Sequence, residues 1–144
     1  MGQLRKILLK DIMFSDPITL KVGEPFSRVA KLFHMHHIRH LPIVDGNNKL
    51  QGLVTERDLL RFMSPRAAEN GEFVDDGSRL DEYSLEQVMK RNLFSLAEND
   101  TLDKAVDLMI KYKLGCIPIV DREKNLKGIV TQIDVLRVLP EHFD

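Results

Sequence analysis

The hydrophobic and polar positions of the chain follow one order of patterns, which begins near position 18. Apolar and polar residues alternate over residues 18–20, as in a short strand, and apolar residues then recur at helical spacing from Phe26 to Phe33. Two apolar runs, 41–44 and 50–54, flank a turn rich in Asp, Gly and Asn and predict a hairpin. A second helical pattern follows the hairpin, so this part of the chain predicts the order β-α-β-β-α.

The same order returns 76 positions later. When the sequence is shifted by 76, residues 11–61 align with residues 87–137 without a gap, and 14 of the 51 aligned pairs are identical. The second unit alternates over residues 94–96, has helical spacing over 102–109 and repeats the hairpin over 117–130. The chain is therefore two copies of one unit, and a function built on one copy is expected in some form in the other.

The duplication predicts the fold class and the domain organisation. We expect an α/β fold in which two β-α-β-β-α repeats, at residues 8–63 and 84–140, pack with pseudo-two-fold symmetry. A unit of this size is only marginally stable alone, because a small domain buries too little of its surface. Residues 64–83 are rich in turn-forming residues and predict a flexible acidic linker with one short helical turn.

Composition narrows the possible functions. The net charge of −1 and the 43% of hydrophobic residues are typical of a globular domain and give no basis for nucleic-acid binding. The single cysteine, Cys116, excludes an internal disulfide and fits a reducing compartment. The apolar run Ile7–Leu9 is too short for a signal peptide, and no run approaches the ~20 residues of a membrane span. We therefore expect a cytoplasmic protein that binds neither nucleic acid nor membranes.

One heptapeptide pattern ends the hairpin in both repeats. It reads Gly52-Leu53-Val54-Thr55-Glu56-Arg57-Asp58 in the first repeat and Gly128-Ile129-Val130-Thr131-Gln132-Ile133-Asp134 in the second. The glycine and the apolar pair fit the end of a buried strand. Thr-x-x-Asp fits the start of a helix, where free backbone N–H groups attract an anion. The same spacing also fits a capping box that only stabilises its own helix, so the motif alone leaves both interpretations open.

The repeated unit resembles the CBS domain, which is named after cystathionine β-synthase and forms tandem pairs called Bateman modules. The resemblance depends on the β-α-β-β-α order, on the strand motif Leu41-Pro42-Ile43-Val44-Asp45 with its copy at 117–121, and on Gly-x-x-Thr-x-x-Asp in both repeats. It covers nearly the whole chain. It implies a regulatory module, not an enzyme, that binds adenosine-containing ligands in the cleft between the repeats. AMP, ADP and ATP are the first candidates, and S-adenosylmethionine and NAD-type ligands are also known for the family.

The resemblance also implies roles for individual residues. Asp58 and Asp134 would accept hydrogen bonds from the ribose hydroxyls, as an acidic residue does in dinucleotide-binding folds. Thr55 and Thr131 would contact the phosphate. The residues that would enclose the adenine lie in or just before strands: Ile18 and Thr19, Phe94 and Ser95, His40 and Leu41, and Cys116 and Ile117.

The first implied site has nearby basic residues that the second lacks. Arg39, His40 and Arg57 would offer positive charge to a phosphate, whereas their aligned positions hold glycine, cysteine and isoleucine. The nearby cation of the second site is Lys113. We therefore expect two unequal sites, of which the one at Thr55 prefers the more highly charged ligand.

Two other interpretations compete with nucleotide sensing. In one, the chain is a ligand-free dimerisation or scaffold module, and the Thr-x-x-Asp motifs only cap helices. In the other, four clustered histidines hold a metal, because His36 and His40 are four residues apart. The helix is expected to end near His37, and this makes a solvated helix end the preferred explanation of the cluster: His34, His36, His37 and His40.

The expected partners follow from the helix faces and from the resemblance. The final helix of each repeat carries apolar residues that a free-standing module would leave partly uncovered: Leu59, Phe62, Leu136 and Leu139. A symmetric homodimer is the expected way to cover them. The resemblance implies a regulated enzyme or transporter as a further partner, with the adenosine ligand shifting the balance between arrangements of the repeats.

Overall fold

The computed structural model describes residues 2–63, 65–67, 73–75 and 80–142. The chain forms two compact units, neither of which is one continuous stretch. The Asp58 unit comprises Thr19–Gly46 and Gln51–Arg91, and the Asp134 unit comprises Met1–Ile18, Asn47–Leu50 and Asn92–Asp144. None of the described helices is long and apolar enough to cross a membrane.

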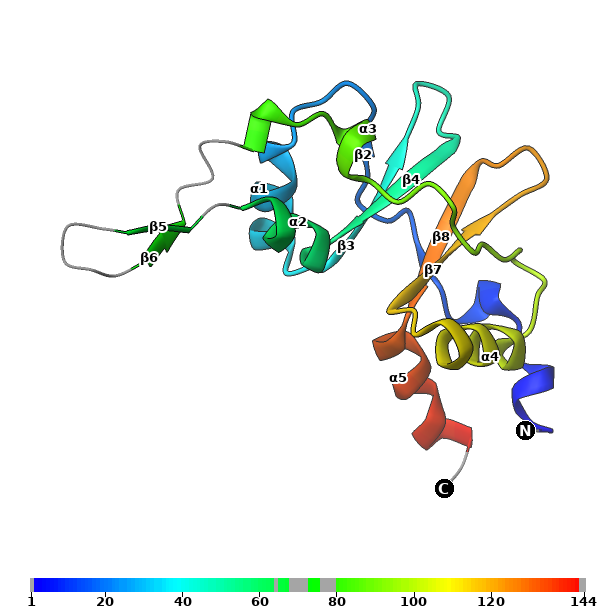
Figure 1. Cartoon of the computed structure of the whole chain (residues 1–144). Coiled ribbons are helices and arrows are strands. Elements are labelled where there is room, and N and C mark those ends of the chain that lie inside the picture. Colours follow the sequence, from blue (N-terminus) through cyan, green and yellow to red (C-terminus); the bar gives the residue numbers. More distant parts are fainter. Residues whose placement is uncertain (1, 64, 68–72, 76–79, 143–144) are drawn as a thin grey trace. The chain divides into compact units, whose positions relative to one another are not determined.

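The Asp58 unit is built on a three-stranded sheet in the order β2-β3-β4 (Figure 1). β2 runs parallel to β3, with Leu20 opposite Ile43. The two helices α1 and α2 pack against each other, and α1 also packs on β3. This is the predicted order of elements: β2 (Leu20–Lys21), α1 (Ser27–His36), β3 (His40–Val44), β4 (Leu50–Thr55) and α2 (Glu56–Phe62).

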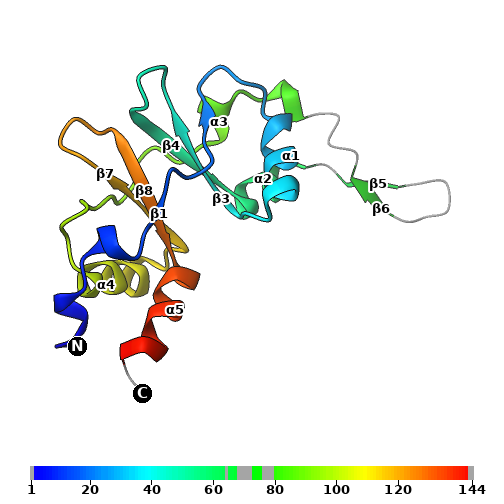
Figure 2. The ribbon, with the colours of Figure 1, turned by 180° about the vertical axis from the view of Figure 1, so that it is seen from behind.

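The Asp134 unit repeats this plan around the sheet β1-β8-β7 (Figure 2). Both strand pairings of this sheet are antiparallel, and the register of β7 against β8 shifts between Ile119 and Val120, where β8 has one extra residue, Lys127. The strand expected at 94–96 is reduced to a single parallel bridge between Leu96 and Ile119. The elements are two short 3-10 helices η1 (Leu4–Lys6) and η2 (Leu9–Asp11), then β1 (Phe14–Ser15), α4 (Leu102–Tyr112), β7 (Cys116–Val120), β8 (Leu126–Thr131) and α5 (Gln132–His142).

The segment that precedes each repeat packs on the other repeat. The N-terminal segment belongs to the Asp134 unit, where the backbone of Leu9 donates to Asp100 over 2.9 Å and β1 pairs with β8. The segment before the second repeat belongs to the Asp58 unit, where Leu53 and Lys90 exchange backbone hydrogen bonds of 3.0 and 2.9 Å. Each compact unit therefore includes a segment from the other half of the sequence. The predicted repeats at 8–63 and 84–140 assign these segments to the repeat that follows them in the sequence, and not to the unit on which they pack.

Strand residues and one face of each helix form the core of each unit, and four consecutive residues are buried in each of β3 and β7. In the Asp134 unit the core cluster includes the fully buried residues Leu9, Leu102, Ile117, Ile119 and Val130. In the Asp58 unit the fully buried residues include Phe26, Val29, Leu41, Ile43 and Val54. The helical and strand periods of the sequence account for both sets, because each period places every member on one side of its element.

Three aromatic rings join the ends of the Asp58 unit. Phe62 at the end of α2 makes edge contacts with Phe26, at 5.9 Å between ring centroids, and with Tyr83, at 4.8 Å. Leu59 is buried at 6% exposure, so the expectation that it is uncovered is wrong. The edge contact of Phe62 with Tyr83 helps to attach residues 80–91 to the first repeat.

The ends of the helices differ in part from the sequence prediction. α1 and α4 end where predicted, and their C-caps His37 and Lys113 both adopt the left-handed conformation, at φ 53° and 55°. The N-cap of α4 is Thr101, although the sequence predicts Asp100 as the N-cap, because aspartate is a preferred capping residue and Asp103 follows three residues on. Asp100 instead accepts a 2.7 Å hydrogen bond from the Ala97 N–H. A carboxylate one residue before the cap thus supports the preceding turn and not the helix.

α1 receives its cap from a distant residue. Its own N-cap position, Phe26, has no side chain that can accept a hydrogen bond. The backbone N–H and the hydroxyl of Ser27 each donate to the Asp81 carboxylate over 2.9 Å. Asp81 lies in η3 (Leu80–Glu82), within the expected linker. This residue therefore replaces the local cap that the sequence around Pro25 does not supply.

The segment between the repeats contains further short elements. The backbone of β5 (Pro65–Ala67) pairs antiparallel with that of β6 (Phe73–Asp75). η3 and the short helix α3 (Leu85–Val88) follow. The turn-forming residues at 70–71 and 76–78, on which the linker prediction rests, lie outside the described residues.

Candidate functional site

The first candidate site lies where β4 passes into α2. Thr55 is the N-cap of α2, in extended conformation, and forms a complete capping box with Asp58. The Thr55 N–H and hydroxyl donate to Asp58 Oδ2 over 2.9 and 3.0 Å, and the Asp58 N–H donates to Thr55 Oγ1 over 3.3 Å. The capping interpretation of Thr-x-x-Asp therefore describes the geometry of this motif.

The second candidate site has the same hydrogen bonds at the junction of β8 and α5. The Thr131 N–H and hydroxyl donate to Asp134 Oδ2 over 2.8 and 3.0 Å, and the Asp134 N–H donates to Thr131 Oγ1 over 3.4 Å. In both motifs the cap uses only one carboxylate oxygen, Oδ2. The other oxygen, Oδ1, is left for a different partner, and here the two sites diverge.

Asp58 is surrounded by positive charge. Its Oδ1 lies 3.7 Å from Arg61 Nη1 and 3.9 Å from Lys90 Nζ. Asp58 is 1% exposed and is the only buried charged residue in the described part of the chain. A buried carboxylate is tolerated only when it is paired and hydrogen-bonded, and the capping bonds and the two cations meet that condition.

Asp134 has a different environment. It is half-buried, and it forms no ion pair with any residue that the structure describes. Its unit contains an arginine at the position equivalent to Arg61, namely Arg137, and both arginines are exposed, but among the described residues only Arg61 forms an ion pair with the aspartate of its motif. The Oδ1 atom of Asp134 therefore lacks the two cations that lie beside Oδ1 of Asp58, and it is the more available of these two oxygens to accept a hydrogen bond from a ligand hydroxyl.

Lys90 is a site residue that the sequence analysis did not include. It occupies the position in its segment that Phe14 occupies in the N-terminal segment, because Lys90 bridges to Leu53 and Phe14 pairs with Ile129 at the same 76-residue offset. Phe14 is 59% exposed. The signal was present in the repeat alignment as a lysine aligned with a phenylalanine. The alignment alone does not show that this lysine belongs to a site. That follows only because the segment before each repeat packs on the other repeat, which puts Lys90 beside Asp58.

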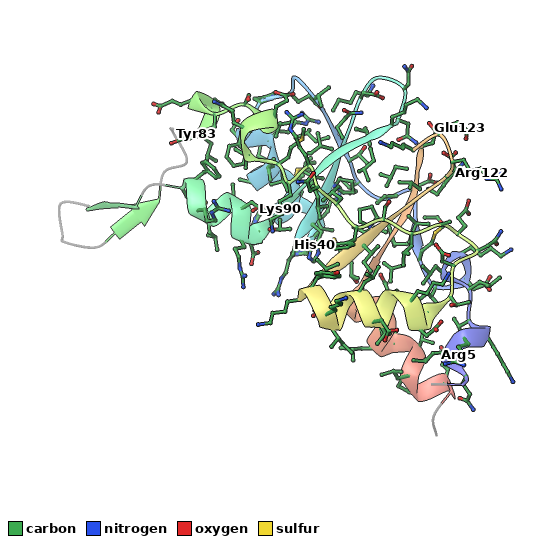
Figure 3. All side chains as sticks on the ribbon, turned by 45° about the vertical axis from the view of Figure 1, so that its right-hand side comes forward. Arg5, His40, Tyr83, Lys90, Arg122 and Glu123 are labelled. Atoms are coloured by element: carbon green, nitrogen blue, oxygen red, sulfur yellow. The ribbon has the colours of Figure 1, made fainter. Side chains whose placement is uncertain are left out.

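His40 and Arg39 also lie in the Asp58 unit. His40 begins β3, and Figure 3 shows its side chain and that of Lys90 in the same unit. Burial lowers the pKa of His40 below its usual value, and the charges of Arg39 and Lys90 lower it further, against an opposing effect of Glu56. The Arg39 carbonyl accepts a 2.9 Å hydrogen bond from the Glu56 N–H, which ties the start of β3 to the start of α2.

The other residues predicted for the first site are less closely grouped. Arg57 is exposed on α2 and forms no ion pair within the described ranges. Thr19 is half-buried in the Asp58 unit, whereas its neighbour Ile18 belongs to the Asp134 unit. The structure thus brings Arg39, His40, Thr55 and Asp58 into one unit with Lys90, and it assigns Ile18 to the other.

The predicted residues of the second site lie in the Asp134 unit. Cys116 is buried at the start of β7 and is paired in register with Thr131. Lys113 is the exposed left-handed C-cap of α4, and Ser95 is exposed. Phe94 is 39% exposed, and its ring stacks on that of Tyr112 with centroids 4.2 Å apart. Tyr112 was not predicted, because helical spacing alone does not show that it meets Phe94.

The histidine cluster does not form a metal site in the described part of the chain. No group of three or more histidine, cysteine, aspartate or glutamate side chains that could hold a metal ion is found there. His34 and His36 are exposed on the last turn of α1, and His37 is the exposed C-cap. These three side chains occupy a solvated helix end.

Comparison with known proteins identifies the family. The sequence model of the CBS domain matches residues 9–65 and 85–141. L-aspartate semialdehyde sulfurtransferase of Methanocaldococcus jannaschii is 32% identical over 91% of this chain and 23% of its own length. A CBS domain-containing protein of Dictyostelium discoideum is 30% identical over 93% of this chain and 92% of its own.

Solved structures give the same result. The crystal structure of the CBS domain pair of protein MJ0100, in complex with 5′-methylthioadenosine and S-adenosyl-L-methionine, matches with a TM-score of 0.76 and 30% identity, over 93% of this chain and 96% of that one. The chain spans only 23%, 46% and 27% of the lengths of three of the curated relatives that it matches. The chain belongs to the CBS domain family and consists of a tandem pair of these domains.

Proposed function

We propose that this chain is a regulatory module that binds adenosine-containing ligands, with AMP, ADP and ATP as the first candidates. The observation on which the proposal rests is the pair of Thr–Asp constellations, each placed at the end of a buried strand within a CBS domain. The complex of the MJ0100 domain pair with two adenosine derivatives supports this class of ligand. S-adenosylmethionine and NAD-type ligands belong to the same class.

The chemistry of the constellations suits a nucleoside. A carboxylate can accept two hydrogen bonds from the vicinal hydroxyls of a ribose, and Oδ1 of Asp58 or Asp134 is the oxygen that the cap does not use. The threonine hydroxyl, which now bonds to the carboxylate, can turn to a phosphate oxygen. A phosphate next to Asp58 itself would be repelled, so the ribose must lie between them and the phosphate must lie toward the cations.

We further propose that the module acts without catalysis and as a homodimer. It would regulate an enzyme or transporter, either as a separate chain or within a longer one. The relatives that it matches over a quarter of their length include a sulfurtransferase and a homoserine O-acetyltransferase. In such proteins a tandem CBS pair is one part beside others, which supports a regulatory role for this chain.

Ligand-dependent thermal unfolding tests the proposal. A ligand that binds only the folded state stabilises it by about 2.7 kcal/mol at a hundredfold excess over its dissociation constant. The unfolding temperature should therefore rise with AMP, ADP, ATP or S-adenosylmethionine and should not rise with GMP at the same concentration. The absence of a shift with every adenosine ligand would contradict the proposal.

The scaffold function is the second candidate, and one observation favours it. In both motifs the threonine hydroxyl and the Oδ2 atom of the aspartate already form a helix cap. A scaffold would keep its oligomeric state and its unfolding temperature in all adenosine ligands. The same thermal experiment therefore separates the two candidates.

A further inference from the structure

The two candidate sites differ at one structurally equivalent position that the family motifs do not include. Lys90 and Phe14 stand 76 residues apart and pair with equivalent residues, Leu53 and Ile129, of the two hairpins. Each therefore lies beside the strand that ends in the Thr–Asp motif of its unit. This equivalent position holds a lysine in the Asp58 unit and a phenylalanine in the Asp134 unit.

The surroundings of Lys90 form a cationic cluster. Its ammonium group lies 3.9 Å from Asp58 Oδ1, and its side chain is still 54% exposed. Arg61 is on the same carboxylate oxygen, and Arg39 with Lys90 acts on His40. Because one carboxylate is shared by two cations, an incoming phosphate would find positive charge that is only partly neutralised. A lysine with its flexible stem can turn from Asp58 to that phosphate.

Among the described residues of the Asp134 unit, no cation pairs with Asp134, and apolar groups are exposed instead. Phe14 is 59% exposed, and Ile133, which replaces Arg57, is 54% exposed. The stacked rings of Phe94 and Tyr112 are also partly exposed in this unit. Desolvating a phosphate beside these groups would be costly, whereas an uncharged substituent would gain from contact with them.

We propose that Lys90 and Phe14 determine which class of adenosine derivative each site takes. Lys90 selects a 5′-phosphorylated adenosine at the Asp58 site, and Phe14 selects an adenosine with an uncharged 5′ group at the Asp134 site. Binding of the phosphate also releases Asp58 from Lys90, which frees Oδ1 for the ribose. This inference rests on the proposed function and adds to it the class of adenosine derivative that each site binds.

Calorimetric titration with AMP and with adenosine tests the role of Lys90. The Asp58 site is measured alone in an Asp134→Ala background. Lys90→Met should weaken AMP binding about tenfold, which is about 1.4 kcal/mol, and change adenosine binding by less than about twofold. Lys90→Arg, which keeps the charge, should retain most of the AMP affinity.

Lys127→Met is the matched control. Lys127 also lies 3.9 Å from an aspartate, Asp121, and is 44% exposed, but it belongs to β8 of the other unit. It should leave both affinities unchanged. The reciprocal variant Phe14→Lys, in an Asp58→Asn background, should raise the affinity of the Asp134 site for AMP relative to adenosine. Circular dichroism verifies that each variant is folded.

The outcomes separate this inference from the proposed function. If the parent protein binds AMP or adenosine but Lys90→Met weakens both equally or neither, the role of Lys90 is wrong and the sensor function stands. If Lys127→Met weakens AMP as much as Lys90→Met does, the effect is general electrostatics and the inference is again wrong. If the parent protein binds neither probe nor any other adenosine ligand, the proposed function and this inference both fail.

Discussion

Asp58 and Asp134 occupy the same position of the repeat, yet they contribute differently to stability. Both cap a helix, and losing such a cap costs about 1 kcal/mol. Asp58 is also buried and is the counter-ion of Arg61 and Lys90. Removing it leaves both cations without their carboxylate, and because both cations are more than half exposed, the loss of these ion pairs adds up to about 1 kcal/mol.

We therefore predict that Asp58→Ala lowers the free energy of unfolding by about 2 kcal/mol and Asp134→Ala by about 1 kcal/mol. Urea unfolding without ligand measures both. The two variants are each other's control, because the capping bonds are the same. Equal losses would show that the two cations add nothing to the stability of the ligand-free protein.

The protonation of His40 gives the Asp58 unit a pH dependence. Burial and the neighbouring cations lower its pKa in the folded state below the usual 6.5. As the pH falls below 6.5, His40 takes up a proton in the unfolded chain before it does so in the folded protein, so the free energy of unfolding must decrease. The stability is fully present above pH 6.5 and is lost toward the lower pKa of the folded state.

His40→Gln removes this proton while keeping a polar side chain of similar size. We predict that the unfolding temperature of the parent protein falls more between pH 7.5 and pH 5 than that of His40→Gln. Thermal unfolding at several pH values measures the difference. His34→Gln, an exposed histidine at the end of α1, is the matched control and should retain the slope of the parent protein. Parallel slopes for all three proteins would disprove the assignment to His40.

At the scale of the elements, the glycine of each heptapeptide allows a segment from the other half of the sequence to approach the hairpin closely. The segment at Met89 and Lys90 approaches Gly52, and the segment at Met13 and Phe14 approaches Gly128. A Cβ atom on Gly52 would lie 2.5 Å from Met89 Sδ and 2.9 Å from the Lys90 carbonyl oxygen. A Cβ on Gly128 would meet Met13 Sδ at 2.7 Å and the Phe14 carbonyl oxygen at 2.9 Å. Because a backbone carbonyl is involved in both cases, rotation of the methionine cannot relieve the clash.

We predict that Gly52→Ala and Gly128→Ala each lower the free energy of unfolding by about 1–3 kcal/mol, as overpacking does. Gly46→Ala is the control, since no heavy atom lies within 4 Å of a Cβ placed there. It should change the stability by no more than about 0.5 kcal/mol. Denaturant unfolding of the three variants tests this, and a Gly52→Ala protein as stable as Gly46→Ala would contradict the close approach.

Periodicity predicted the elements that carry their own pattern and missed those that depend on packing. The helices α1 and α4 and both hairpins were predicted, because their apolar residues recur at the period of the element. β1 was not predicted, since two residues with exposed side chains carry no period. The cap of α1 by Asp81 lies 54 residues away from Ser27 and leaves no local signal.

The candidate sites follow the same division. Thr55, Asp58 and their copies were found from a local motif that repeats. Lys90 was not predicted. It reaches Asp58 because the segment before the second repeat packs on the first repeat, and no local sequence pattern indicates on which repeat a segment will pack. The unequal charge of the two sites was predicted from Arg39, His40 and Arg57. The ion pairs with Asp58 come instead from Arg61 and Lys90.

At the scale of the whole molecule, the exposed apolar residues of α4 and α5 predict the oligomeric state. Ile110 is 73% exposed, and Leu136 is 58% exposed, on two helices that pack against each other. Ile133 on α5 is exposed as well, at 54%. Exposed apolar residues on two helices that pack against each other are characteristic of an interface, and a second copy of the chain offers the same surface for a symmetric contact.

We therefore predict that the purified protein sediments as a dimer and that a double variant, Ile110→Lys with Leu136→Lys, sediments as a monomer at the same concentration. Two lysines facing their own copies across a two-fold axis would bury like charges, which costs far more than the lost apolar contact. Asn99→Lys adds one lysine at an exposed turn of the same unit, away from these apolar residues in the sequence, and should remain dimeric. A double variant that stays dimeric would place the interface on another surface, such as that around Met35 and Leu60.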